Sequence, residues 1–266
     1  MGESAKIINK KSNFDIRHLE AEKFIKERLN PSFGEEAYLH LSDLYLALEP
    51  VLSSCCGHLL DFGCGGSPYR GIFKGTTYHR ADVGSDLEGI DFQIGIDCQT
   101  GAPSGFYDSV LSTQVLEHVP DEKLYLQEAY RVLKPGGKLL ISTHGAFFDH
   151  GCPYDFHRWT VDGLALEMRS SGFIIEKMQK LTLGARAVFF LAENQFGGLW
   201  GSRATLRGWG LWFFQRFFWM NRAKRHQWVD QNFPHLRVAD ALNSEPLYIC
   251  IFAVGVKPKN ESRTDQ

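Results

Sequence analysis

The chain has 266 residues, of which 44% are hydrophobic, and its formal net charge is −2. This length and apolar content can bury one large core and exclude an intrinsically disordered protein, while the near-neutral charge gives no general attraction to nucleic acid. The N-terminus lacks the apolar core of a signal peptide, and no run of about 18 apolar residues predicts a membrane-spanning helix. The six scattered cysteines suit reduced thiols, so we expect a cytoplasmic protein.

The chain begins with two predicted amphipathic helices, residues 18–29 and 35–54, because apolar residues repeat there at spacings of three and four. Short apolar runs then predict strands, and a helix that Asp121 can cap lies between the last two of them. Strands that alternate with helices predict an α/β fold with a doubly wound, mainly parallel sheet. The predicted strands are residues 58–62, 77–83, 91–96, 107–113 and 138–143.

A glycine-rich loop, "LLDFGCGGSPY" at residues 59–69, follows the first predicted strand. Glycines there adopt positive φ without strain and let a ligand approach the backbone at the carboxyl end of the strand. Asp82 ends the second strand, where a carboxylate can accept hydrogen bonds from both hydroxyls of a ribose. Pro68 stands where a dinucleotide loop needs its third glycine, which disfavours a pyrophosphate. We therefore predict a nucleoside site, with a ligand-free glycine turn as the alternative.

Three segments, "LLDFGCGGSP", "FYDSVLSTQVLEHVPD" and "EAYRVLKPGGKLLIST", resemble the motifs of class I S-adenosylmethionine-dependent methyltransferases. The resemblance covers about residues 38–182 and is to the group with small-molecule, lipid and glycan acceptors. It implies S-adenosylmethionine as the cofactor and a seven-stranded Rossmann-like sheet. Its last strand, "LYICIFAVGV", would run antiparallel between strands five and six.

The resemblance also implies roles for individual residues of the cofactor site. The residue before Asp82 is Ala81, where the family more often has a larger hydrophobic residue, so Asp86 is the fallback for the ribose acid. In this resemblance Asp61, Gly63 and Gly65 contact the methionine part of the cofactor, and Asp82 binds the ribose. Asp97 binds the adenine amine, and Cys98 contacts the adenine through its backbone N–H. Gln114, Val115 and Leu116 flank the sulfonium and the adenine.

Histidines follow the fourth and fifth strands, where an acceptor would bind. Methyl transfer to a hydroxyl requires loss of its proton, and a histidine tuned near neutrality can take it. His144 ends the fifth strand and is the predicted base; His118 and His157 are further candidates, although His118 also suits a structural role. The spacing of His150, Cys152 and His157 could suit zinc, but a reduced cysteine beside solvated histidines is the preferred interpretation, so we expect no metal.

The segment "PYDFHRWTVDGL" carries the predicted substrate-binding residues Tyr154, Arg158 and Trp159. Arg158 could hold an acidic or sugar group as a bidentate donor, and Trp159 could stack on it. In the alternative, Arg158 pairs internally and Trp159 packs against the helix that begins at Thr160. The sequence leaves both alternatives open.

An aromatic and basic insertion precedes the last strand. Residues 195–231 hold five of the six tryptophans and six basic residues against one acid, Asp230. Such a segment suits peripheral contact with the inner face of a membrane, or burial as a lid or a homodimer contact. Stacking on single-stranded nucleic acid is the third alternative, which the net charge disfavours.

The predicted domain organisation follows from these segments. The leading functional prediction is a methyltransferase that methylates a hydroxyl of a glycan or lipid-linked saccharide. The alternatives are a lipid, quinone or natural-product acceptor, and a non-catalytic regulator that binds S-adenosylmethionine. The predicted parts are N-terminal helices (1–57), the S-adenosylmethionine-binding core (58–182), the helical insertion (183–243), the last core strand (244–257) and a disordered tail (258–266).

Overall fold

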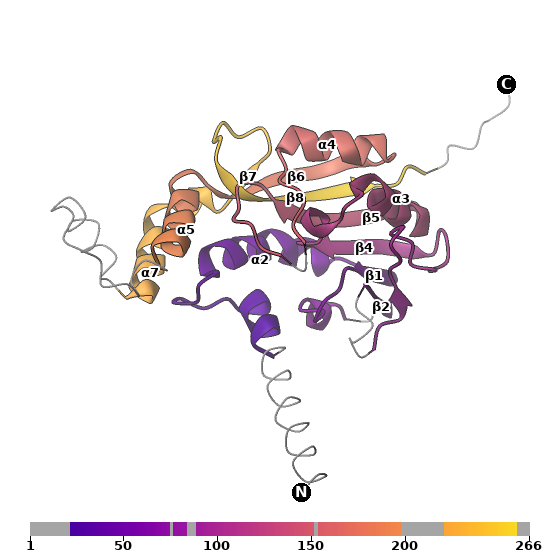
Figure 1. The fold of residues 1–266 in the computed structure, drawn as a ribbon, viewed down its shortest axis with the longest axis horizontal. Coiled ribbons are helices and arrows are strands. Elements are labelled where there is room, and N and C mark those ends of the chain that lie inside the picture. The colour runs from indigo at the N-terminus through magenta and orange to yellow at the C-terminus, as the bar shows by residue number, and fades with distance from the viewer. Residues whose placement is uncertain (1–21, 75–76, 84–88, 152–153, 198–220, 260–266) are drawn as a thin grey trace, which may run out of the picture.

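The computed structural model describes residues 22–74, 77–83, 89–151, 154–197 and 221–259 (Figure 1). Its sheet has eight strands in the order β3-β2-β1-β4-β5-β8-β6-β7. Strands from β3 to β5 pair in parallel, and β8 runs antiparallel between β5 and β6. The doubly wound, mainly parallel fold and its antiparallel last strand are therefore confirmed.

The strands differ in detail from the prediction. The short edge strand β7 makes eight strands where seven were expected, because its three residues pair with β6. Strand β5 begins at Leu133, five residues earlier than predicted, since Gly136 and Gly137 exchange backbone hydrogen bonds with Lys257 beyond β8. The strands are β1 (His58–Phe62), β2 (Thr77–Asp82), β3 (Phe92–Gln93), β4 (Tyr107–Thr113), β5 (Leu133–His144), β6 (Ile174–Leu183), β7 (Val238–Asp240) and β8 (Tyr248–Val256).

Polar side chains start two helices as their sequences predict. The Asp121 carboxylate accepts from the Leu124 N–H at 2.9 Å, and the Thr160 hydroxyl oxygen accepts from the Gly163 N–H at 3.0 Å. Among the described helices, none is both long and apolar enough to cross a bilayer. Residues 22–29 are helical, and the α-helices that follow are α2 (Tyr38–Leu52), α3 (Glu122–Val132), α4 (Val161–Ser170), α5 (Gly184–Gly197) and α7 (Arg222–Asn232). The 3-10 helices are η1 (Arg70–Ile72), η2 (Leu116–His118) and η4 (Pro234–Leu236).

Helices cover both faces of the sheet (Figure 1). Leu60 and Phe62 of β1 pack into the core beneath α3 and α4, whereas Leu59 packs into the core beneath α2. Because side chains alternate along a strand, Asp61 lies on the same face as Leu59. The carboxylate of Asp61 is therefore buried on the α2 side of the sheet, where it accepts a hydrogen bond from the hydroxyl of Tyr78.

A buried ion network fixes α2 against the insertion. Asp43 of α2 and Arg186 of α5 are fully buried, and their Oδ2 and Nε atoms lie 2.6 Å apart. Arg237 approaches the other oxygen of Asp43 at 2.7 Å, and Asp230 of α7 lies 2.5 Å from Nη1 of Arg186. The hydroxyl of Tyr38 donates to Asp230 at 2.6 Å. Two cations thus balance two carboxylates at the junction of three helices.

Removing one member of this network should destabilise the fold strongly. Arg186→Met leaves Asp43 with one cation and Asp230 with none from this network, so we expect the free energy of unfolding to fall by about 3 to 5 kcal/mol. Urea denaturation measures the loss. The matched control is Lys138→Met, whose pair with Glu176 is exposed and should contribute less than about 1 kcal/mol. Equal losses in the two variants would contradict a structural role for the network.

Candidate functional site

The glycine loop after β1 combines tight packing with open backbone. Gly63 has a φ of 78°, and a Cβ there would lie 2.6 Å from both methyl carbons of Val115, so only glycine fits. Gly65 has a φ of 47°, and no described atom lies within 4 Å of the place its Cβ would take. The Gly65 N–H donates to the Asp82 carboxylate at 2.7 Å. The loop therefore offers open backbone beside a carboxylate.

Asp61 lies beneath this loop and is almost completely buried. Burial raises the pKa of its carboxyl group to about 7, although the hydrogen bond from Tyr78 opposes that rise. The neighbouring carboxylate of Asp82 adds to the increase. A cation bound at the loop would reverse this effect, because it would stabilise the ionised form of Asp61.

A pocket of about 580 Å³ adjoins the ends of β2 and β3. Two apolar side chains of its lining face solvent: Val83 is 64% exposed, and Ile96 is fully exposed. Asp97 follows Ile96 and is exposed, but the Cys98 N–H donates to the Gly95 carbonyl at 2.9 Å. The turn thus already uses the Cys98 N–H, so the predicted adenine contact of that donor gains no support and stays a prediction.

The three residues after β4 point in different directions. Gln114 bridges elements through its amide, with Nε2 3.3 Å from Ser142 Oγ and Oε1 3.3 Å from Nε2 of His40. Val115 packs on Gly63, as described above. Leu116 is fully buried in the core shared with α3 and α4. Its side chain therefore packs into the core, and its predicted place beside the sulfonium and the adenine stays a prediction that only its backbone can meet.

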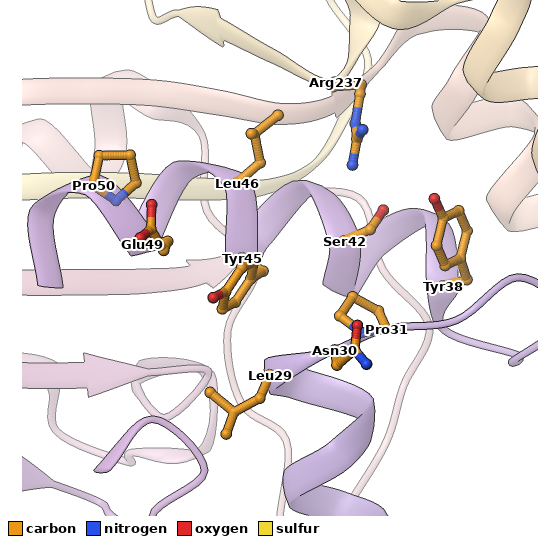
Figure 2. A pocket seen from close by; sticks show the side chains of 10 residues that line it. All are labelled: Leu29, Asn30, Pro31, Tyr38, Ser42, Tyr45, Leu46, Glu49, Pro50 and Arg237. Atoms are coloured by element: carbon orange, nitrogen blue, oxygen red, sulfur yellow. The ribbon is translucent and has the colours of Figure 1, made fainter. Parts of the chain in front are cut away.

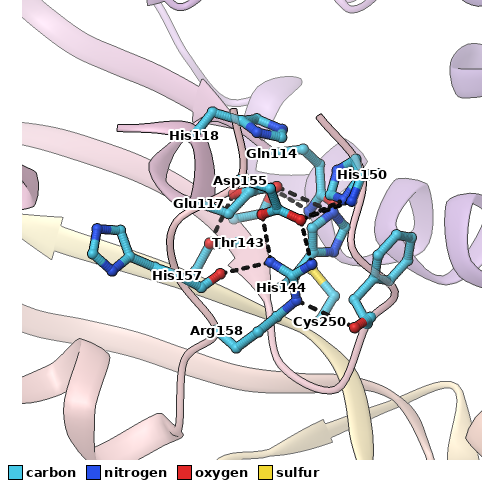
Figure 3. A network of polar contacts seen from close by, with 12 residues as sticks. Gln114, Glu117, His118, Thr143, His144, His150, Asp155, His157, Arg158 and Cys250 are labelled. Atoms are coloured by element: carbon cyan, nitrogen blue, oxygen red, sulfur yellow. Dashed lines mark hydrogen bonds and ion pairs between the residues drawn. The ribbon is translucent and has the colours of Figure 1, made fainter. Parts of the chain in front are cut away.

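A histidine cluster lies at the carboxyl ends of β4 and β5 (Figure 3). His144 is buried and stacks on Phe147 with ring centroids 3.8 Å apart, and the His150 ring centroid is 5.0 Å from that of His144. The His118 ring lies 4.8 Å from that of His150, and its Nδ1 donates to the Tyr154 carbonyl at 2.7 Å. The cluster thus joins two of the three predicted catalytic histidines.

His157 is not part of this cluster. Its Nε2 lies 3.5 Å from Glu122 of α3, and Figure 3 shows its ring directed away from His144. The backbone N–H groups of Phe156 and His157 both donate to the Glu117 carbonyl, which fixes the direction of the loop. The prediction of His157 as a catalytic residue is not supported by this geometry, because the loop turns its side chain outward.

Glu117 is a member of the cluster that the sequence did not single out. Its side chain is fully buried, with Oε1 3.1 Å from Nε2 of His144 and Oε2 accepting from the Thr143 hydroxyl at 2.8 Å. Burial raises the pKa of Glu117 to about 7 and lowers that of His144 well below its ordinary value. The only local signal for Glu117 was its position before His118. His40 of α2 gave no signal, because packing alone brings it to Gln114.

Arg158 is engaged internally, as the second sequence alternative proposed. Its Nη1 and Nη2 atoms donate to the Asp155 carboxylate at 2.6 and 2.5 Å, and Nη2 also donates to the Phe148 carbonyl at 2.5 Å. Trp159 is partly buried against the core. These contacts favour the internal alternative for both residues, and substrate binding by them stays a prediction. Tyr154 is 66% exposed and remains available.

Charged side chains in the described parts of the insertion form buried ion pairs with one another. Arg225 Nε lies 2.6 Å from Glu193, and His226 Nε2 lies 2.8 Å from the other oxygen of that carboxylate. Most of the aromatic and basic run that was predicted to contact a membrane or a second chain, residues 198–220, lies outside the described residues. Its structural role therefore stays a prediction.

A smaller pocket, of about 300 Å³, lies between α2 and residues 29–31 (Figure 2). Tyr45, Glu49 and Arg237 contribute to its lining, and Arg237 is already paired with Asp43. No residue of the glycine loop or the histidine cluster lines it. This pocket is therefore separate from the candidate site.

Comparison with known proteins gives a family match. The family model described as "Methyltransferase domain" matches residues 33–183. A ubiquinone biosynthesis O-methyltransferase from Xanthomonas oryzae pv. oryzae is 30% identical over 120 residues, 36% of this chain and 50% of the relative. The protein of that name from Pectobacterium atrosepticum is 31% identical over 107 residues, 32% of this chain and 42% of the relative. The chain thus spans about half the length of the curated relatives it matches.

Solved structures share the fold. Haemonchus contortus phosphoethanolamine N-methyltransferase 2, in complex with S-adenosyl-L-methionine, gives a TM-score of 0.50 at 17% identity over 90% of this chain and 56% of that chain. The [4+2]-cyclase SpnF gives a TM-score of 0.51 at 18% identity over 85% and 84% of the two chains. At these identities the likeness shows the fold alone.

Asp61→Asn should change how stability depends on pH. The folded pKa of about 7 lies above the ordinary aspartate value of about 4, so the stability contributed by the neutral acid is complete below pH 4 and is lost as pH rises through 7. Asparagine can keep the hydrogen bond from Tyr78 and cannot ionise. From pH 4 to 8 we expect the unfolding free energy of the parent to fall by about 2 to 4 kcal/mol relative to Asp61→Asn.

Denaturant unfolding at several pH values measures this difference. Asp162→Asn is the matched control, because it makes the same change at an exposed carboxylate far from the glycine loop in sequence. Parallel pH curves for the parent and Asp61→Asn would show that Asp61 ionises in the folded chain as it does in the unfolded chain.

Proposed function

The chain belongs to the family of methyltransferase domains, and from this premise we propose that it transfers a methyl group from S-adenosylmethionine to a hydroxyl of a small-molecule acceptor. S-adenosylmethionine, when bound, supplies an electrophilic methyl group on a cationic sulfur. The observation that carries the proposal is the open glycine backbone beside Asp82, which lies at the same edge of the sheet as the buried pair of His144 and Glu117.

The cofactor fits the residues of the first half of the site. The free space over Gly65 admits the methionine part, and Asp82 would accept from the ribose hydroxyls. Val83 and Ile96 offer exposed apolar surface to the adenine, with Asp97 beside them for its amine. Asp61 would balance the positive charge of the methionine part, because its carboxylate is buried beneath the loop and burial raises its pKa even though the charge of Arg80 opposes that rise.

Proton removal would fall to the pair of His144 and Glu117. The lowered pKa of His144 keeps its imidazole neutral at pH 7, so it can accept the proton of an acceptor hydroxyl. Nδ1 of His144 has no hydrogen-bond partner among the described residues. The imidazolium that forms would be stabilised by the carboxylate of Glu117 at 3.1 Å, which ionises above a pH of about 7.

The acceptor that the site supports best is a hydroxyl on a planar ring. The partly buried ring of Phe147 stacks on His144, and the buried Phe190 packs behind it with ring centroids 5.7 Å apart. Such aromatic faces suit a phenol or a quinone precursor. The name of the similar Xanthomonas and Pectobacterium proteins, ubiquinone biosynthesis O-methyltransferase, supports the same class.

A saccharide hydroxyl, free or lipid-linked, is the second candidate. The exposed rings of Tyr154 and Phe156 lie 5.7 Å apart beside the histidine cluster and could stack on a sugar. Incubation of cell extracts with the chain and S-adenosylmethionine, followed by a mass-spectrometric search for products heavier by one methylene unit, distinguishes the two acceptors. A chain that binds S-adenosylmethionine and methylates nothing in any extract would instead be a non-catalytic regulator.

Asp82→Ala should weaken S-adenosylmethionine binding by about 2 to 3 kcal/mol, because the variant loses hydrogen bonds to a charged acceptor. Isothermal calorimetry measures the affinity. Asp240→Ala at the opposite edge of the sheet is the control and should bind as the parent does. Two results would contradict S-adenosylmethionine as the cofactor. One is an unchanged affinity of Asp82→Ala, and the other is that the parent binds a nicotinamide dinucleotide more tightly than S-adenosylmethionine.

His144→Ala should lower turnover by about 10² to 10⁴ and leave the affinity for S-adenosylmethionine intact, since the base acts on the acceptor alone. His157→Ala is the matched control, because its ring faces Glu122 and should matter little to turnover. Turnover is measured with the acceptor that the extract screen identifies. A loss below tenfold for His144→Ala would indicate that alignment of the acceptor suffices without a base.

A further inference from the structure

Glu117, His144 and His150 share a geometry that proton transfer alone does not require. Each offers one donor atom, and these atoms all lie within 4.8 Å of one another. Two donors on one zinc ion, at bonds of about 2.0 to 2.1 Å, lie about 3 to 3.4 Å apart. Oε1 of Glu117 and Nε2 of His144 are 3.1 Å apart, and a small movement of His150 would complete the set.

The same carboxylate oxygen has an unmet polar requirement. Oε1 of Glu117 is buried and has no hydrogen-bond partner among the described residues, although Nε2 of His144 is near. The two atoms are thus close together without the alignment of a hydrogen bond. A buried acceptor without a partner costs about 1 to 3 kcal/mol, and an ion between the two side chains would remove that cost.

Neighbouring groups orient two of the three side chains. Nδ1 of His150 lies 3.3 Å from Asp155 Oδ2 and 3.2 Å from the Phe148 carbonyl, which leaves its Nε2 for another partner. The Thr143 hydroxyl donates to Oε2 of Glu117, which leaves Oε1 (Figure 3). Histidine ligands of metals commonly have their second nitrogen held by a carboxylate or a carbonyl, and ligating carboxylates are likewise hydrogen-bonded.

We propose that Glu117, His144 and His150 bind one divalent transition-metal ion, and that Zn²⁺ is the ion that fits two imidazoles and a carboxylate best. This donor set leaves a fourth position open in catalytic zinc sites, and His150 stands at the open side with 37% of its side chain exposed. An acceptor hydroxyl in that position would lose its proton to solvent more readily. The ion would then activate the acceptor hydroxyl, and His144 would act as a ligand of the ion instead of as the base.

The role in activation rests on the proposed function, whereas ion binding does not. The full chain, freed of metal with a chelator, is titrated with Zn²⁺ by calorimetry, and we expect one ion per chain. Glu117→Gln and His150→Ala should each weaken binding at least about tenfold, and Thr143→Val, which only removes the support of Glu117, by about tenfold. Mg²⁺ should not compete, because it prefers oxygen ligands.

Glu176→Gln and His235→Ala are the matched controls, since both side chains are exposed and outside the cluster. Equal Zn²⁺ affinity in the parent and in folded His150→Ala and Thr143→Val overturns the proposal even if Glu117→Gln fails to fold. Calorimetry with S-adenosylmethionine on the same samples tests the proposed function separately from the metal site. Cofactor binding without Zn²⁺ binding defeats only the metal site, and the reverse result defeats only the proposed function.

Discussion

The parallel register of β1, β4 and β5 sets the position of every group in the site. Asp61 pairs in register with Leu111, and Thr113 pairs with Ser142. Neighbouring strands are about 4.8 Å apart, so the loops after β1 and β5 leave the sheet about 10 Å from each other. A glycine loop and a histidine at the ends of these strands therefore lie at the same edge of the sheet, within the span of one cofactor and its acceptor. Methyl transfer needs this adjacency, because donor and acceptor have to be aligned.

Helix α2 contributes His40 to the site. The position of this helix depends on the buried network of Asp43, Arg186 and Asp230. This network joins α2 to α5 and α7, and so joins the insertion to the N-terminal part. The network also sets the position of His40, because His40 lies on the same helix three residues before Asp43. The imidazole of His40 contacts the side chain of Gln114. The insertion also contacts this region directly, because the ring of Phe190 in α5 lies 5.8 Å from that of His40, centroid to centroid.

Burial gives the site a consistent electrostatic character. It raises the pKa of Asp61 and Glu117 to about 7 and lowers the pKa of His40 and His144. Burial thus disfavours charge on these side chains, and a bound cation would favour the ionised carboxylates. The positively charged methionine part beside Asp61 and a metal ion beside Glu117 would be two cases of the same complementarity. Each would be held by a carboxylate that is poorly solvated without it.

The sequence by itself determined the features that depend on local chain chemistry: the alternation of strands and helices, the glycine loop, Asp82 at the end of β2 and His144 at the end of β5. Glycine conformation, strand ends and helix caps need only neighbouring residues, so they can be predicted. Tertiary structure alone decided where side chains point. It joined Glu117 to His144, brought His40 from a distant helix and turned His157 outward. These outcomes depend on packing between segments far apart in the chain, which no local pattern contains.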